Sequence, residues 1–372
     1  MIYLDNAATT YPKPKSVYKA LERAVMLYGG NPGRGSHLLS REASRLIYDC
    51  REEIASLFDG RPENVVFTMN ATHAINVAFN ALKKKNNVSL ISSFEHNAVL
   101  RTVAAYGEYD VFDCNGASLD IVSAFVKKLD KRPSLVVCNH MSNICGAVMP
   151  VEQIGSICKK RGIPFIIDAS QSAGRKKLSL KDTHASAICA PGHKSLYGVQ
   201  GCGFVIFSDK YSESANSLNT FVYGGNGVNS LETGMPDFLP ERLEAGTPST
   251  PAIASLCAGI KEVRRIGIDN IEYRERMLGK RLIEGLSVIP GVELYGRDYE
   301  GGTILFNQNG TPSERLAEAL DKNGICVRAG YHCCPLGHGT LNTPEGGAVR
   351  ASFSIFNNEY DVDRLLSVLN KK

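Results

Sequence analysis

Two residues near the middle of this 372-residue chain have the chemistry of a cofactor site. Asp168 ends the apolar run 163–167, and Lys194 follows a second apolar run at 185–190. Each run is predicted to be a buried strand, and ligands bind at the carboxyl ends of strands in open α/β sheets. Pyridoxal phosphate (PLP) needs a lysine for its Schiff base and an acid that keeps its ring nitrogen protonated. The Asp168–Lys194 pair therefore favours a PLP site.

Two other predicted strand ends carry polar groups toward the same edge. Thr72 follows the strand that ends at Thr68 and begins a helix, a geometry in which backbone N–H groups and hydroxyls bind phosphate. Taken alone, this segment is more simply explained as an ordinary helix N-cap, to which Asn and Thr are well suited. His96 follows the strand that ends at Ser92 and could stack on the pyridine ring, although a surface histidine is the simpler interpretation. Neither G-x-G-x-x-G nor a Walker A sequence occurs, which disfavours a dinucleotide or a nucleoside triphosphate.

The elements that must position these residues alternate along the chain. Between residues 60 and 210, short apolar strands alternate with helical stretches, a pattern typical of an α/β fold with a mostly parallel sheet and helices on both faces. A stretch rich in glycine and proline, 223–250, ends this pattern. We therefore predict a large domain at residues 13–250. Residues 1–12 and 251–372 are predicted to form a smaller α+β domain.

Composition argues against several classes of function. A net charge of +4, with both signs interspersed, is too small to predict binding to nucleic acid or to a membrane surface. No apolar stretch approaches the roughly 20 residues that span a bilayer, and no signal peptide is visible. The chain has 11 cysteines, an odd number, and no C-x-x-C pair. This usage predicts reduced thiols and a cytoplasmic protein.

Eight short segments match one family in the same order along the chain. They lie at residues 3–10, 34–37, 70–72, 95–97, 142–143, 168–171, 192–194 and 244–248. With them the chain resembles the class-V aminotransferases of PLP fold type I, and among these the group II cysteine desulfurases. The resemblance covers essentially the whole chain. It implies the large PLP-binding domain of fold type I transferases with a smaller C-terminal domain.

The resemblance implies a cofactor role for each matching residue. Lys194 would form the Schiff base with PLP, and Asp168 would pair with the ring nitrogen. Gln171 would bind the ring hydroxyl, and His96 would stack on the ring and take part in catalysis. The implied ligands of the phosphate are Ala71, Thr72, His193 and, from the second subunit of a homodimer, Thr247. Pro191 stands where the family has a hydroxyl that binds this phosphate, so tight PLP binding is in question.

Substrate contacts follow from the same resemblance. Arg350 would bind the substrate α-carboxylate, a role that suits a bidentate guanidinium, whereas a surface arginine in a strand is the alternative. Asn143 would lie near both the ring hydroxyl and the substrate, and Asn6 would also contact the substrate. The segment 328–336 resembles the R-x-G-x-H-C-A segment of the family and places the catalytic thiol at Cys333.

Cysteine chemistry makes that assignment sensible, although alternatives remain. A thiolate is a strong nucleophile, and Arg328 and His332 could lower the pKa of the Cys333 thiol. Cys333 and its neighbour Cys334, which replaces the usual alanine, could instead be inert core thiols. A metal site that adds His338 is a further alternative, but adjacent cysteines lack the usual ligand spacing, so we expect no metal.

The implied function is a PLP-dependent cysteine desulfurase. It would convert L-cysteine to L-alanine, hold the sulfur on Cys333 as a persulfide and pass it to a sulfur-acceptor protein, for example in iron–sulfur cluster assembly. A selenocysteine lyase acting on L-selenocysteine, or another class-V aminotransferase or lyase, would keep the same PLP residues. A non-catalytic PLP-fold scaffold in sulfur-cluster assembly is the alternative from a different class.

Overall fold

The central sheet of the computed structural model, which describes residues 1–33, 35–84, 88–296 and 301–371, has seven strands. Arg34 of the segment 34–37 thus lies outside the described residues. The strand order is β2 (Val65–Thr68), β8 (Gly203–Phe207), β7 (Ala187–Pro191), β6 (Phe165–Asp168), β5 (Leu135–Asn139), β3 (Ser89–Ser92) and β4 (Tyr109–Phe112). The five strands from β7 to β4 run parallel, and β8 is antiparallel to both of its neighbours. The predicted mostly parallel sheet is confirmed.

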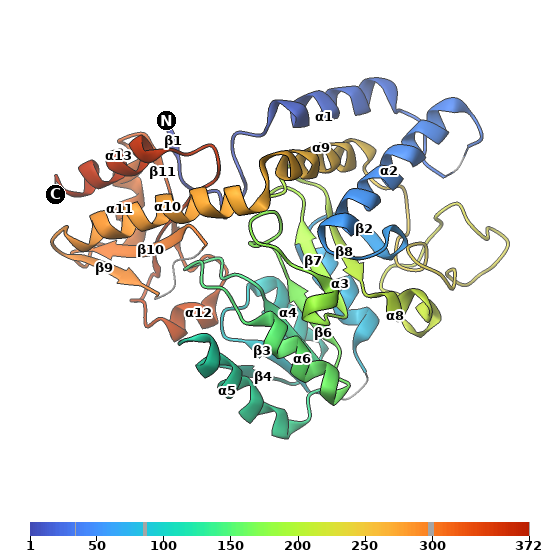
Figure 1. The fold of residues 1–372 in the computed structure, drawn as a ribbon, viewed down its shortest axis with the longest axis horizontal. Helices are drawn as coiled ribbons and strands as arrows, with labels where there is room; N and C mark the ends of the chain where they lie inside the picture. Colours follow the sequence, from blue (N-terminus) through green and yellow to red (C-terminus); the bar gives the residue numbers. More distant parts are fainter. Residues whose placement is uncertain (34, 85–87, 297–300, 372) are drawn as a thin grey trace.

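Helices cover both faces of this sheet because its strands are apolar on both sides. Alternate residues of one strand enter different cores: Val65 packs in one cluster and Val66 in the other. The second cluster contains the apolar sides of α3 (Ala71–Leu82) and α4 (Asn97–Tyr106). The first contains residues of α2 (Leu38–Leu57), α5 (Ser118–Lys128), α6 (Val151–Arg161) and α9 (Thr250–Ile266). Shorter helices are α7 (Leu180–Thr183) and α8 (Asp209–Ser212), and α1 (Lys15–Leu27) packs along α9 (Figure 1).

A second, antiparallel sheet forms a separate layer at the other end of the molecule (Figure 1). Its order is β12 (Arg328–Gly330), β13 (Ala348–Ser352), β10 (Thr303–Gln308) and β9 (Val292–Tyr295). Around it lie α10 (Ile268–Ser287), α11 (Ser313–Asp321), α12 (Pro335–Thr340) and α13 (Glu359–Leu369). The N-terminal strand β1 (Ile2–Tyr3) pairs in parallel with β11 (Ile325–Cys326) of this part.

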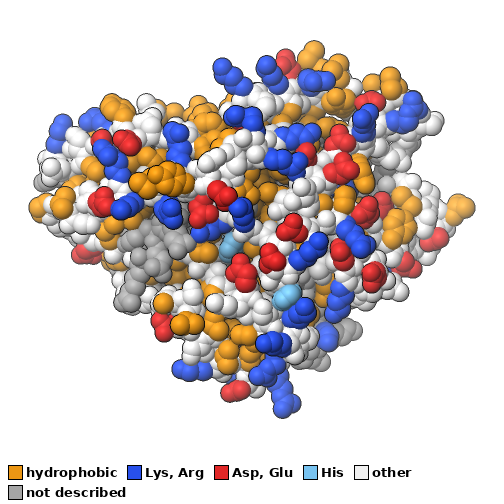
Figure 2. Space-filling model, viewed as in Figure 1, with side chains coloured by type: hydrophobic (Ala, Val, Ile, Leu, Met, Phe, Trp, Pro, Cys, Tyr) orange, Lys and Arg blue, Asp and Glu red, His pale blue; other side chains and the backbone are white. Residues whose placement is uncertain are grey.

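The boundary between the two parts is best placed by their cores. Residues of α9 pack in the first large-sheet cluster, whereas Leu278 of α10 packs with Leu4 and Phe306 in a third cluster. The division at residue 250 stays a prediction, and we propose that the small domain begins within α10. Lys and Arg side chains are interspersed with Asp and Glu over the visible face (Figure 2). Among the described residues, no helix has the length and apolar character needed to cross a membrane.

Candidate active site

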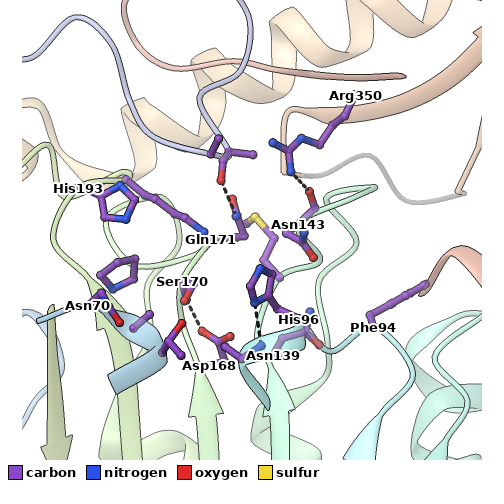
Figure 3. Close-up of a pocket in the computed structure, with 18 of the residues that line it drawn as sticks. Asn70, Phe94, His96, Asn139, Asn143, Asp168, Ser170, Gln171, His193 and Arg350 are labelled. Carbon is purple, nitrogen blue, oxygen red and sulfur yellow. Dashed lines mark hydrogen bonds between the residues drawn. The ribbon is translucent and has the colours of Figure 1, made fainter. Parts of the chain in front are cut away.

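A cavity of about 210 Å³ lies at the carboxyl ends of the parallel strands, between the large sheet and the small domain. Figure 3 shows side chains that converge on it from strand ends far apart in the sequence. Nine residues predicted from the sequence line this cavity: Ala71, Thr72, His96, Asn143, Asp168, Gln171, His193, Lys194 and Arg350. The cavity also has walls formed by Asn70, Asn139, Ser170, Pro191 and Arg328, among others.

Lys194 is an unusually weak base for a lysine. Burial lowers the pKa of its ammonium group to about 8, with the charge of Arg350 acting in the same direction and that of Asp168 opposing it. Removing a cation from water disfavours its charged form, so part of the Lys194 population is neutral near physiological pH. A neutral amine is the form that attacks an aldehyde, and this is the property that a Schiff-base lysine needs.

The backbone just before Lys194 is held by the N-terminal segment. The carbonyl oxygen of His193 accepts hydrogen bonds from Thr10 N at 3.2 Å, Thr9 Oγ1 at 3.1 Å and Lys13 Nζ at 2.6 Å. Burial also lowers the pKa of Lys13 to about 8. Nothing in the sequence analysis singled out Lys13, whose contact joins residues 180 positions apart. These three donors fix the position of the peptide that carries Lys194.

The residues assigned to the cofactor ring are fixed by local hydrogen bonds. Nδ1 of His96 accepts from Ala98 N at 3.0 Å, at the start of α4. Burial and the charge of Lys194 lower the pKa of His96 to about 4, so the ring is neutral and its proton lies on Nε2. Oδ1 of Asp168 accepts from Ser170 N at 2.9 Å, which leaves its other carboxylate oxygen for a ring nitrogen. Nε2 of Gln171 donates to the carbonyl of Ala7 at 2.9 Å.

The start of α3 offers donors for an anion. Asn70 caps this helix by accepting from His73 N at 2.9 Å, and no hydrogen bond between described residues uses the N–H groups of Ala71 or Thr72. First-turn N–H groups have no partner within a helix, so they are available to a phosphate. A Cβ atom at Gly203 would lie 2.7 Å from the carbonyl carbon of Asn70, so this glycine lets the turn approach β8 closely.

Arg350 provides a buried guanidinium on the opposite side of the cavity. It is 2% exposed, and its Nη1 donates to the carbonyl of Asn143 at 2.9 Å. Nη2 donates to Asp5 Oδ1 at 2.6 Å, and the buried Nε has no partner among the described residues. Arg328 lies directly opposite Arg350 on the neighbouring strand and also lines the cavity. The two guanidinium groups carry more positive charge than the Asp5 carboxylate can offset, which favours an anionic ligand.

Cys333 is not among the residues that line the cavity, but its loop is tied to them. Asn97 N donates to the carbonyl of Cys333 at 2.7 Å, and Asn143 Nδ2 donates to the carbonyl of His332 at 2.9 Å. Both His332 and Cys333 adopt left-handed backbone conformations, with φ of 50° and 55°. Such a conformation costs about 1–2 kcal/mol for a residue other than glycine. The half-buried Cys333 is therefore presented by a strained turn at the edge of the site.

Of the two neighbours of Cys333, His332 differs from the cation that the sequence suggested, whereas Cys334 has the buried surroundings of a core thiol. Burial lowers the pKa of His332 to about 2, so this ring is neutral and cannot stabilise a thiolate as a cation. Cys334 is fully buried, and its thiol donates to the carbonyl of Phe94 at 3.4 Å. Burial raises the pKa of Cys334 well above the usual range of a thiol. Among the described residues, no group of three or more His, Cys, Asp or Glu side chains could hold a metal ion.

Two other predicted residues lie outside the cavity. Thr247 lines a separate cavity of about 220 Å³ that opens beside β2 and the start of α9. The segment before it is anchored by Glu244, which receives two hydrogen bonds of 2.9 Å from Arg51 Nη2 and one of 3.1 Å from Phe67 N. Asn6 is buried, and its amide donates to the carbonyl of Ser352 at 3.0 Å.

Glu95 is a buried acid that sequence reasoning placed only within a motif. It is 0% exposed, and its Oε1 accepts from Ser92 Oγ at 2.5 Å and from Asn139 N at 2.7 Å. Its Oε2 has no partner among the described residues. Burial raises the pKa of Glu95 to about 8, and the nearby Asp168 carboxylate acts in the same direction. At neutral pH this carboxyl therefore keeps its proton.

The residues present fit PLP at each of its functional groups. The unpaired N–H groups of α3 match a phosphate, the weakly basic Lys194 matches an aldehyde, and the Asp168 carboxylate matches a ring nitrogen. Pro191 lines the same cavity but has no hydroxyl to offer the phosphate.

Comparison with known proteins points to the same chemistry. The model of the family "Aminotransferase class-V" matches residues 2–365. A probable cysteine desulfurase of Pyrococcus abyssi is 32% identical, with alignment over 100% of this chain and 94% of the relative. The cysteine desulfurase of Haloferax volcanii is 29% identical over 100% of this chain and 89% of its own. The apo structure of the cysteine desulfurase from Thermococcus onnurineus superposes with a TM-score of 0.91, at 31% identity and 100% and 94% coverage.

The fold has further support from more distant structures. The cysteine desulfurase CsdA of Escherichia coli superposes with a TM-score of 0.88 over 99% of this chain and 94% of its own, at 24% identity. At that level of identity the likeness concerns the fold alone. With a family model spanning nearly all of the sequence, a full-length relative above 30% identity and a cavity suited to PLP, the chain belongs to the class-V aminotransferases.

Proposed function

We propose that the protein is a PLP-dependent cysteine desulfurase that converts L-cysteine to L-alanine and keeps the sulfur on Cys333 as a persulfide. The observation that carries this proposal is the position of the Cys333 loop. Its backbone is bonded to Asn97, directly after His96, and to Asn143, which accepts from Arg350. A thiol on this loop is thereby held next to both the cofactor residues and the carboxylate-binding residue.

The residues of the cavity have separate tasks in this reaction. PLP, when bound, supplies an electron sink that stabilises negative charge at the substrate Cα. Arg350 binds the substrate α-carboxylate, since it is a buried guanidinium whose Nε still lacks an acceptor. Asp168 holds a proton on the ring nitrogen by placing a carboxylate beside it. Lys194 removes the Cα proton as a general base, because its lowered pKa keeps a neutral amine near physiological pH.

Cys333 performs the sulfur transfer. Its thiolate attacks the sulfur atom of the substrate, so an S–S bond forms while the Cβ–S bond breaks. The electron pair of the broken bond passes to the carbon skeleton, which takes up protons and leaves as alanine. The balance is one L-cysteine and one thiol converted to one alanine and one persulfide. Half-burial leaves the Cys333 sulfur within reach of an acceptor protein, which would then take the sulfur.

A homodimer with shared sites is part of the proposal. Thr247 does not line the cavity of its own chain, which is expected if it contacts the phosphate bound by the second copy. Large apolar side chains are exposed on α1, on α2 and in the segment after η3 (Ala215–Ser217): Val25, Met26, Leu27, Leu38, Leu39, Phe221, Val222 and Tyr223. Apolar surface of this extent suits an interface between two copies. None of the 11 cysteines, all of which lie within the described residues, forms a disulfide, which suits our proposal of a cytoplasmic enzyme.

A complementation assay tests the shared site. Lys194→Ala and Thr247→Val chains are unfolded together, refolded and assayed for alanine. A mixed dimer has one site with both an intact lysine and an intact threonine from the other chain, so activity returns if Thr247 acts across the interface. A mixture no more active than the sum of its parents would contradict that arrangement.

One assay decides the main proposal. Purified protein is incubated with L-cysteine and PLP, and alanine and sulfide are measured with and without a reductant. We expect alanine from the wild type and almost none from Cys333→Ala. No alanine from the wild type, or undiminished alanine from Cys333→Ala, would exclude this desulfurase mechanism. Pyruvate instead of alanine would indicate a β-eliminating lyase, and activity only with L-selenocysteine would indicate a selenocysteine lyase.

A further inference from the structure

The Cys333 loop contains a chain of hydrogen bonds that the proposed reaction does not use. Nε2 of His332 lies 3.3 Å from the carbonyl oxygen of Arg328, and Nδ1 of His332 lies 3.2 Å from Nε2 of His338. Nδ1 of His338 in turn lies 2.8 Å from Oγ1 of Thr343. The two imidazole rings are stacked, with centroids 5.4 Å apart and planes 10° from parallel. The chain thus runs from the edge of the cavity to the turn that follows α12.

Only one arrangement of protons satisfies this chain. The carbonyl oxygen of Arg328 can only accept, so Nε2 of His332 carries the proton. Burial and the charge of Arg350 lower the pKa of His332 to about 2, so its Nδ1 is an acceptor and Nε2 of His338 must donate. Burial likewise lowers the pKa of His338 to about 4, so its Nδ1 accepts from the Thr343 hydroxyl at 2.8 Å, a shorter contact than the 3.4 Å from this hydroxyl to the carbonyl oxygen of His338. Every hydrogen bond points from Thr343 toward Arg328.

This chain of hydrogen bonds supports a strained piece of backbone. His332 and Cys333 both have positive φ, a conformation that residues other than glycine keep only where their surroundings fix it. Asn143 and Asn97 bind the two carbonyl groups of this step, but neither fixes the ring of His332. The ring is held by its two nitrogen contacts and by stacking on the ring of His338. If His338 turned away, Nδ1 of His332 would be left buried without a donor, which is costly.

The turn at residues 342–347 is joined to this loop at several points. Gly346 N donates to the hydroxyl of Tyr331 at 3.0 Å, and Thr343 N donates to the carbonyl of His338 at 3.1 Å. A Cβ atom at Gly347 would lie 2.2 Å from the carbonyl oxygen of Gly330, so this position requires a glycine for the turn to lie against the loop. Thr343 is therefore placed by backbone contacts and not only by its own hydroxyl.

We propose that His338 and Thr343 are positioning residues for the catalytic thiol. They hold the ring of His332 in one tautomer and one orientation, and through it they fix the left-handed His332–Cys333 step that directs the Cys333 sulfur. The inference rests on the proposed role of Cys333 in sulfur transfer. Neither residue lines the cavity, whereas Arg350 does, so substrate binding is left to Arg350 and its neighbours.

The test compares Thr343→Val, which keeps the volume and removes the hydroxyl, with Thr343→Ser, which keeps the hydroxyl. Thr340→Val is the matched control, since among the described residues the hydroxyl of Thr340 makes no hydrogen bond. In the holoenzyme we measure kcat and KM for alanine formation, and the rate at which iodoacetamide alkylates Cys333. For Thr343→Val we expect kcat to fall roughly five- to tenfold, KM to stay within about twofold, and alkylation to become several times faster.

A purely structural role would not produce this pattern. Thr343→Ser should stay within about twofold of the wild type in all three quantities, and Thr340→Val should match the wild type. His338→Gln, which can still donate to His332, should be less impaired than His338→Leu. The inference is overturned if Thr343→Val and Thr340→Val behave alike in both kcat and alkylation. If the wild type forms no alanine, the proposed function fails, while the alkylation rates still decide the role of Thr343.

Discussion

Nη2 of Arg350 lies 2.6 Å from Oδ1 of Asp5, so one ion pair beside the cavity joins the fifth residue of the chain to its last strand. The side chain of Arg350 is 2% exposed and that of Asp5 is 21% exposed. A buried guanidinium depends strongly on its counter-charge, because removing one partner leaves the other without compensation. Asp5 therefore stabilises the same side chain that binds the substrate carboxylate in the proposed reaction.

Removing the Asp5 charge should destabilise the fold. We expect Asp5→Asn to lower the free energy of unfolding by roughly 2–3 kcal/mol, measured by urea denaturation. Asp237→Asn is the matched control, because Asp237 is paired at 3.0 Å with Arg242 but its side chain is 80% exposed. That change should cost less than about 0.5 kcal/mol. Equal losses in the two variants would contradict the role given to burial.

Lys194 should react as a weakly basic amine. In protein freed of PLP, reductive methylation of Lys194, followed by mass spectrometry, should rise with pH and level off above about 8. The reason is that only the neutral amine is nucleophilic. In Asp168→Asn the same inflection should move to lower pH, because the Asp168 carboxylate favours the ammonium form. An inflection near the ordinary lysine value of 10.5 would refute the assignment.

Glu95 should make stability depend on pH. Its pKa is raised from 4.5 to about 8, so the folded protein keeps a proton that the unfolded chain has released between these values. The folded state therefore loses stability as the pH rises from 4.5 toward 8. In Glu95→Gln, a neutral analogue of the protonated acid, this loss should be absent. The difference in unfolding free energy between the wild type and Glu95→Gln should therefore change by a few kcal/mol across this pH range, on the order expected for such a pKa shift. Parallel curves would contradict the prediction.

Cys333 and Cys334 should differ sharply although they are adjacent. Cys333→Ser should abolish alanine formation, because an alcohol cannot accept the sulfur. Cys334→Ser should retain at least about half of the activity, since its hydroxyl can still donate to the carbonyl of Phe94. Peptide mapping after brief iodoacetamide treatment should find label on Cys333 and none on the buried Cys334. Label on Cys334 before Cys333 would reverse the two roles.

Pro191 should limit the affinity for PLP. It lines the cavity beside the phosphate-binding turn but has no donor to offer. We expect Pro191→Ser to tighten PLP binding roughly tenfold in equilibrium dialysis, as for one added hydrogen bond to a charged group. Pro191→Ala removes the ring without adding a hydroxyl and should not tighten binding. If both variants bind alike, the hydroxyl is not what the site lacks.

The sequence predicts most of the site residues that follow the carboxyl ends of strands. Asp168, His96 and Lys194 each follow an apolar run, and parallel strands bring such residues to one edge, so local pattern and sheet topology were sufficient. The mostly parallel sheet followed from the same alternation. Helices α1 and α2 went unpredicted because their apolar faces pack against α9, about 200 residues further along the chain.

Contacts between distant segments were beyond prediction from one sequence. Nothing in the local sequence says that Lys13 bonds His193, that Asp5 pairs with Arg350, or that His338 faces His332. His332 illustrates the limit: its position beside Cys333 suggested a cation, but burial makes it a neutral ring bonded to other groups. The degree of burial depends on the whole fold, and no motif encodes it.

The N-terminal segment sets an order of events during synthesis. The ribosome makes β1 more than 300 residues before its partner strand β11, and it makes Asp5 well before Arg350. A sheet of the large domain can form on the ribosome while these first residues still lack partners. The segment that clamps the peptide before Lys194 is thus itself anchored by the small domain, so the geometry of the lysine depends on strands of both parts of the molecule.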